Sequence, residues 1–83
     1  MARLIIRGKK NYWRYTITMW CYEIKELVEE ELGENVEIIV EDSENDLPQV
    51  YLNDVFVLEG VPKEEGYLLE LIKKVIDQLK YSQ

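Results

Sequence analysis

The spacing of apolar residues in the first half of the chain predicts a strand followed by a helix. Residues 3–7 form a short apolar run closed by a glycine, which is typical of a buried strand. Over residues 13–32 the apolar positions recur every three or four residues, which predicts an amphipathic helix. Asn11 is the expected N-cap and Gly33 the expected end, although two threonines leave open a later start, near residue 16.

The second half of the chain predicts three strands and a final helix. The expected strands cover residues 36–41, 49–52 and 55–58. Asn53-Asp54 separates the last two strands by two residues, which indicates a hairpin. Apolar residues at helical spacing predict the last helix over 66–80. The order strand-helix-strand-strand-strand-helix indicates an α/β fold with one parallel crossover.

The C-terminal half resembles the selenoprotein W/Rdx family, a compact branch of the thioredoxin-like fold. The resemblance rests on Val50-Tyr51-Leu52-Asn53-Asp54, the apolar strand 55–58, and Glu65-Gly66-Tyr67 ahead of an amphipathic helix. These segments are similar to the family's strand, Asn-Gly turn, strand and Gly-aromatic helix start. The resemblance implies a single thioredoxin-like two-layer βαβββα domain over residues 1–83, with a four-stranded mixed sheet and two helices on one face.

The redox motif of that family has no equivalent in this chain. The family carries Cys-x-x-Cys or Cys-x-x-selenocysteine in the loop after the first strand. Alignment places this motif on Tyr12-Trp13-Arg14-Tyr15, so both reactive positions hold tyrosine. A dithiol cycle needs one thiolate that attacks and a second thiol that resolves the mixed disulfide. The resemblance therefore implies a non-catalytic binding domain, and we expect no cofactor and no metal.

Cys21 supports an alternative hypothesis, a monothiol redox protein. Trp20-Cys21 is similar to the start of the thioredoxin motif, with Ile24 at the second cysteine position and Pro48 as the candidate cis-proline. A thiolate at a helix N-terminus is activated by the helix dipole. However, Cys21 also lies on the apolar stripe of the predicted helix, where a free cysteine packs as a small apolar residue.

A segment near the start of the first helix mixes cations with aromatic rings, and it is the candidate binding site. Its members are Lys9, Lys10, Tyr12, Trp13, Arg14 and Tyr15. Such side chains at a helix N-terminus can hold an anion, and they can stack on and neutralise single-stranded nucleic acid. The simpler interpretation places Trp13 in the core and the lysines in solvent. The net charge of −7 argues against an ordinary nucleic-acid binder.

The strands are apolar on both faces, which predicts a second interface. Two helices on one face leave the other face of the sheet open, and strands that are apolar on both faces are expected to be covered on both. An exposed apolar patch marks an interaction surface. We therefore expect a homodimer formed through the open sheet face. The candidate interface residues are Leu4, Ile6, Ile39, Tyr51 and Phe56.

Composition excludes several kinds of chemistry. The 83 residues include no histidine, which removes the commonest general base and metal ligand. The single cysteine excludes an internal disulfide and fits a reducing compartment, so we expect a cytoplasmic protein. The abundance of charged residues is similar to that of proteins from heat-loving organisms.

Charge is distributed unevenly along the chain. No acidic residue precedes Glu23, whereas the polar connection 42–47 and its flank are strongly acidic. The carboxylates there are Glu41, Asp42, Glu44 and Asp46. Their spacing does not match an EF-hand loop, so the expected role of this connection is a solvated loop.

Overall fold

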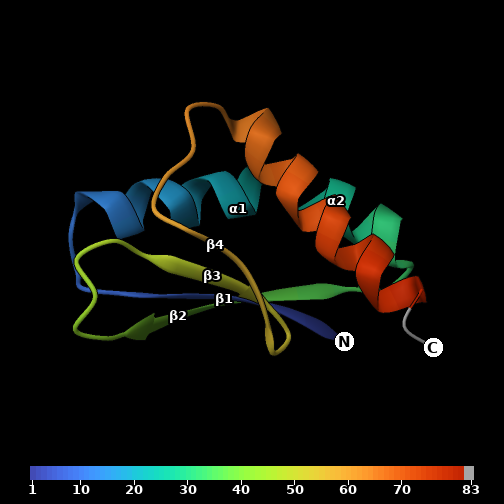
Figure 1. Ribbon diagram of the computed structural model, residues 1–83, viewed down its shortest axis with the longest axis horizontal. Helices are drawn as coiled ribbons and strands as arrows, with labels where there is room; N and C mark the ends of the chain where they lie inside the picture. The colour runs from blue at the N-terminus through green and yellow to red at the C-terminus, as the bar shows by residue number, and fades with distance from the viewer. Residues whose placement is uncertain (82–83) are drawn as a thin grey trace.

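Four strands and two helices make up the fold, and each predicted element is present within one residue of its expected ends (Figure 1). The computed structural model describes residues 1–81. The elements are β1 (Ala2–Gly8), α1 (Tyr12–Leu32), β2 (Val36–Asp42), β3 (Gln49–Leu52), β4 (Val55–Glu59) and α2 (Glu65–Tyr81).

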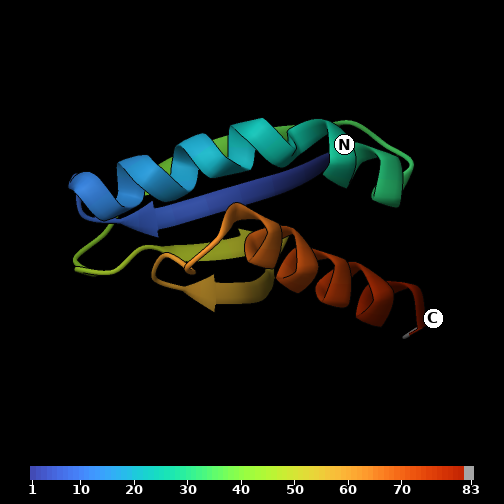
Figure 2. The same cartoon turned by 90° about the horizontal axis from the view of Figure 1, so that it is seen from above.

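The four strands form one mixed sheet in the order β2-β1-β3-β4. β1 pairs in parallel with β2 and antiparallel with β3, and β3 pairs antiparallel with β4. Both helices lie on the same face of this sheet (Figure 1). Seen from above, α1 runs along β1 and β2, whereas α2 runs beside β3 and β4 (Figure 2). The predicted α/β class, with its thioredoxin-like two-layer βαβββα arrangement, is confirmed.

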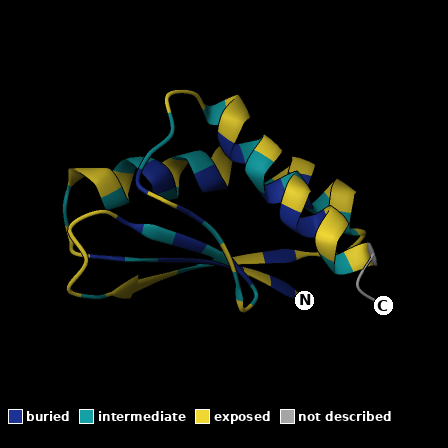
Figure 3. Ribbon diagram, in the orientation of Figure 1, coloured by how far each residue is buried: buried dark blue, intermediate teal, exposed yellow. Residues whose placement is uncertain are grey.

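The hydrophobic core lies between the sheet and the two helices. Figure 3 shows the buried positions along β1 and on the sides of the helices that face the sheet. Leu4 and Ile6 of the central strand are completely buried, and so are Ile17 and Val28 of α1 and Ile72 of α2. No charged side chain among the described residues is buried. Tight burial of branched aliphatic side chains is the main source of stability in a domain of this size.

The ends of α1 are fixed by two local caps. The Oδ1 atom of Asn11 accepts a hydrogen bond of 3.0 Å from the backbone N–H of Arg14. This N-cap starts the helix at Tyr12 and excludes the later start. At the other end Gly33 adopts a left-handed conformation with φ 74°, and its N–H donates to the carbonyl oxygen of Glu29 at 2.8 Å. Within residues 1–81, neither helix has the length and apolarity that crossing a membrane requires.

The phase of β1 differs from the one we predicted. Leu4 and Ile6 were expected on the open face, but both lie in the core under the helices. Ile5 takes the place on the open face, where it pairs with Ile39 of β2 and Tyr51 of β3. The three consecutive apolar residues of β1 do not mark a face, but the charged residues Arg3 and Arg7 alternate with Ile5 and indicate that Ile5 shares the open face with them.

The β3–β4 hairpin turns at Asn53-Asp54, as predicted. Asn53 has φ 56°, the left-handed conformation that asparagine tolerates better than most residues. Its N–H donates to the carbonyl oxygen of Arg3 at 2.8 Å, and its Oδ1 accepts from the N–H of Arg3 at 3.0 Å. The turn is therefore attached to the beginning of β1, which helps to fix the register of the antiparallel strands.

Candidate functional site

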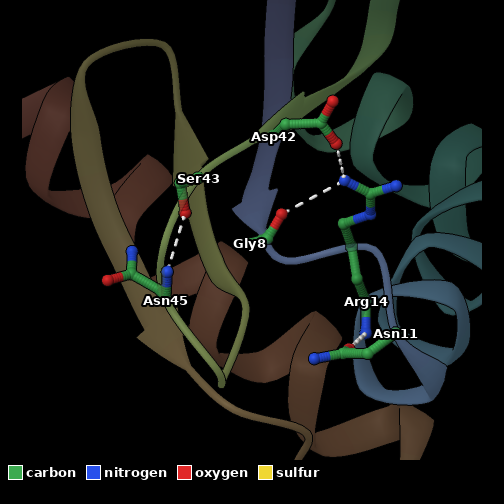
Figure 4. Close-up of polar contacts among 6 residues, drawn as sticks. All are labelled: Gly8, Asn11, Arg14, Asp42, Ser43 and Asn45. Carbon is green, nitrogen blue, oxygen red and sulfur yellow. Dashed lines mark hydrogen bonds and ion pairs between the residues drawn. The ribbon is translucent and has the colours of Figure 1, made fainter.

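The junction of β1 and α1, where the candidate binding segment lies, is closed by Arg14 (Figure 4). One guanidinium nitrogen, Nη1, donates to the carbonyl oxygen of Gly8 at 3.1 Å and also contacts the Oδ1 atom of Asp42. The side chain of Arg14 is only 14% exposed, although it belongs to the first turn of the helix. Arg14 therefore joins the C-terminal ends of β1 and β2 to the start of α1.

The connection between β2 and β3 packs against the same junction. Lys9 donates its backbone N–H to the carbonyl oxygen of Asn45 at 2.9 Å, and its ammonium lies 2.9 Å from Oδ1 of Asp46. The side-chain amide nitrogen Nδ2 of Asn11 donates to the backbone carbonyl oxygen of Asp46 at 2.9 Å. The loop is braced by a bond of 3.3 Å from the N–H of Asn45 to the Ser43 hydroxyl (Figure 4). This acidic loop is solvated, as predicted, but two of its carboxylates also hold cations of the binding segment.

These pairings change the electrostatics of the candidate site. Arg14 and Lys9 each have a carboxylate partner, and the N-cap already uses the N–H of Arg14. Lys10 is exposed and makes no ion pair within the described residues. Anion binding at a helix start depends on free N–H groups and uncompensated positive charge. The carboxylates offset much of that charge, so the segment is a weaker anion site than its composition suggested.

The aromatic rings of the segment lie on the surface. Trp13 is about half exposed, so the interpretation that placed it in the core is wrong. Its indole meets the ring of Tyr12 edge to face, with 5.6 Å between centroids. Tyr12 and Tyr15 are exposed and line a groove of about 420 Å³ beside α1. The other residues that line this groove are Lys10, Asn11, Arg14, Thr18 and Val40.

The geometry that the monothiol hypothesis needs is not present. Cys21 lies in the middle of α1 with no exposed surface, and burial raises the pKa of its thiol to about 12. Pro48 precedes β3 as expected, but its peptide bond is trans, and its ring packs against Gly8 at the end of β1. A reactive cysteine needs access and a lowered pKa. Cys21 and Pro48 therefore have structural roles and do not form the catalytic pair that the monothiol hypothesis predicted.

The open face of the sheet carries an organised set of long side chains. The guanidinium of Arg7 donates to Oε1 of Glu41 at 2.5 Å and lies over the ring of Tyr51, 4.7 Å from its centroid. The hydrogen bond to Glu41 raises the pKa of Arg7. Tyr51 meets Phe56 edge to face at 5.7 Å. Ile5, which pairs with Ile39 and Tyr51, is only 5% exposed, although both helices lie on the other face (Figure 1).

Polar bonds extend this set of side chains toward β4. The hydroxyl of Tyr51 donates to Oε1 of Gln49 at 3.0 Å, and the amide of Gln49 donates to Oε2 of Glu59 at 3.0 Å. Of the predicted interface residues, Ile39, Tyr51 and Phe56 belong to this face, whereas Leu4 and Ile6 do not. Sequence reasoning missed Ile5 and Arg7. The alternation of Arg3, Ile5 and Arg7 along the strand is the signal that could have placed both on the open face.

Two carboxylates on the helical side have shifted pKa values in opposite directions. Glu29 accepts from the N–H of Val36 at 2.8 Å and from the ammonium of Lys25 at 3.0 Å, and these bonds lower its pKa. Glu65, at the start of α2, has a raised pKa because it shares a hydrogen bond with the carboxyl group of Glu23 on α1. No cluster of metal-binding side chains occurs in the described part of the chain.

Comparisons with protein-family models, curated proteins and solved structures find no match to this chain. The resemblance to the selenoprotein W/Rdx family therefore stays a prediction. Function has to be argued from the geometry of the surfaces described above.

Proposed function

We propose that this protein is a non-catalytic thioredoxin-like interaction domain, related to the selenoprotein W/Rdx family, that forms a homodimer through the open face of its sheet. The observation that carries the proposal is that Phe56 is 50% exposed and Ile39 is partly exposed on the face of the sheet opposite the two helices. A sheet face that is not packed against another layer and that exposes apolar side chains is a common type of interaction surface.

The absence of a reactive group at the start of α1 supports a binding role over catalysis. Tyr12 and Tyr15 stand at the two positions that the family resemblance assigns to its reactive residues. The sole thiol, Cys21, is buried and has a raised pKa. A free, reduced thiol is also compatible with work in the cytoplasm.

The charges on the open face favour a second copy as the partner. Arg3 of β1 and Glu37 of β2 are paired in register, but their side chains form no ion pair within the described residues. In a face-to-face twofold dimer, Arg3 of each copy can pair with Glu37 of the other, because a twofold interface brings the same patch together from both sides. Phe56 and Ile39 then supply apolar contact inside this polar rim.

Sedimentation velocity over a range of micromolar concentrations tests the proposal. The wild-type chain is expected to sediment as a dimer. Phe56→Glu is expected to sediment as a monomer, because it places a charge in the apolar centre of the interface. Tyr67→Glu is the matched control, since Tyr67 is also 50% exposed but lies on α2. A wild-type monomer at all concentrations, or equal behaviour of the two variants, contradicts the proposal.

A further inference from the structure

The outer edge of β2 presents unpaired backbone groups. The carbonyl oxygen of Asn35 accepts from the N–H of Ala2 at 2.9 Å, so this peptide group points toward β1. The N–H of the next residue, Val36, points away from β1 and donates to the carboxylate of Glu29. Because backbone direction alternates along a strand, Ile38 and Val40 also point their N–H and C=O groups outward. These groups have no hydrogen-bond partner in the described part of the chain.

An aromatic stripe of α1 runs beside this free edge. Tyr12, Tyr15 and Tyr22 are 71%, 63% and 59% exposed, and they recur at the spacing of one helix face. Two hollows of about 420 and 590 Å³ lie between this stripe and the helix-facing side chains of β2, Ile38 and Val40. The stripe and the edge thus line two separate hollows on the same side of β2. An added strand could place alternate side chains in these hollows and bond to the backbone of β2.

The charge around the edge selects the kind of strand that fits. On the open face, β2 carries Glu37, which makes no ion pair within the described residues, and Glu41, which is bonded to Arg7. Asp42 ends the strand and contacts Arg14. In antiparallel pairing of two copies centred on Ile39, Glu37 of one copy would lie opposite Glu41 of the other, and like charges directly opposite are destabilising. The net charge of −7 also favours a cationic segment over an acidic one. An occupant of opposite charge is favoured.

We propose that the edge of β2 binds an extended, basic segment of another polypeptide. The segment adds as a strand through the outward N–H and C=O groups of Ile38 and Val40. Its alternate apolar side chains lie against the tyrosines of α1, and a cationic side chain points to Glu37 on the opposite face. This surface shares Glu37 with the open-face dimer interface, but its backbone groups lie at the edge of β2, so Val40→Pro tests the edge and Phe56→Glu tests the dimer separately.

A synthetic peptide with alternating Lys and Val residues and an N-terminal fluorescein is a suitable probe. Its fluorescence anisotropy is expected to rise with protein concentration, and the binding is expected to weaken with added salt. Hydrogen exchange at the amides of Ile38 and Val40 is expected to slow in the complex, because both become donors in the new ladder. The corresponding peptide of Glu and Val is expected not to bind.

Matched variants locate the site. Val40→Pro removes one outward N–H, a change that edge strands tolerate, and is expected to weaken binding about tenfold or more, whereas Val40→Thr keeps the N–H and stays close to wild type. Glu37→Gln is expected to weaken binding and its salt dependence, whereas Glu70→Gln on α2 is expected to change neither. Phe56→Glu is expected to bind the probe as wild type does.

Three results overturn the proposal. The first is that the basic and acidic peptides bind equally well, or that neither peptide binds at low salt. The second is binding without slower exchange at Ile38 and Val40. The third is protection of these amides that grows with protein concentration when no peptide is present, which assigns the edge to a second copy.

Discussion

The two faces of the sheet bury the same strand by different means. On one face Ile6 is covered by helices that pack aliphatic side chains against it, and it has no exposed surface. On the other face Ile5 is almost as well buried, but the groups around it are long side chains of the sheet itself, with Arg7 held over Tyr51. Arginine and tyrosine can do this because their apolar parts cover a neighbour while their polar ends stay in water. A strand that is apolar on both faces therefore does not require a second layer of helices.

The sharpest test of this difference replaces the two isoleucines in turn. Ile6→Ala is expected to lower the free energy of unfolding by about 3–5 kcal/mol, because rigidly packed helices leave a cavity. Ile5→Ala is expected to cost roughly 2 kcal/mol, because the side chains above it can settle into the space. Urea unfolding followed by circular dichroism measures both values. Equal losses would show that the open face is packed as tightly as the core.

The next largest effect concerns the thiol on the helical side. Cys21 has no exposed surface and its pKa is raised to about 12, so a thiol reagent can reach it only when the structure opens. Labelling of the native protein near neutral pH is expected to be slower than labelling in urea by about a hundredfold or more. A native rate that matches the unfolded rate would instead indicate an accessible thiol and revive the monothiol hypothesis.

A smaller effect is expected from the arginines of the open face. Arg7 bonds to Glu41 and covers Tyr51, whereas Arg3 forms no ion pair within the described residues. Arg7→Ala is therefore expected to lower the urea midpoint and to increase hydrogen exchange at Ile5. Arg3→Ala, the control on the same strand and face, is expected to leave both unchanged at a protein concentration low enough for the chain to be monomeric. If Arg7→Ala has the same urea midpoint as wild type, cover by the Arg7 side chain does not explain why Ile5 is buried.

The sequence predicted the elements well because each had a local signal. The stripe of α1, the cap at Asn11 and the turn at Asn53-Asp54 all act between residues that are close in the chain. The phase of β1 was missed because Leu4, Ile5 and Ile6 are alike in polarity, although Arg3 and Arg7, two residues to either side of Ile5, mark its face as the open one. The pairing of Ile5 with Ile39 and Tyr51 confirms this placement.

The candidate site was harder to predict from the sequence. Composition identified the cations Lys9 and Arg14 near the helix start, but their partners, Asp46 and Asp42, lie more distantly in the chain. The fold brings them together because β1 and β2 end side by side and α1 begins there. A charge pattern read along the sequence shows which groups are present, but not which of them neutralise one another.

The smallest predicted effects come from two glutamates of the helical layer, which respond to pH in opposite ways. The pKa of Glu29 is lower in the folded protein than in the unfolded chain. Its contribution to stability is therefore present at neutral pH and is lost as pH falls through the folded pKa. The pKa of Glu65 is raised by Glu23 in the folded protein. Its contribution to stability is therefore present below the unfolded pKa and is lost as pH rises through the folded pKa.

Charge-removing substitutions separate these two contributions. At pH 7, Glu29→Gln is expected to lower the urea midpoint, because the bonds to Val36 and Lys25 weaken, whereas Glu65→Gln is expected to raise it by relieving repulsion from Glu23. Near about pH 4 both differences are expected to shrink, since the wild-type carboxyl groups become partly protonated. A shift of the same sign for both variants at pH 7 would contradict the assigned contacts. If the two shifts in urea midpoint have opposite signs at pH 7 and both become smaller in acid, then Glu29 stabilises and Glu65 destabilises the helical layer that covers Ile6.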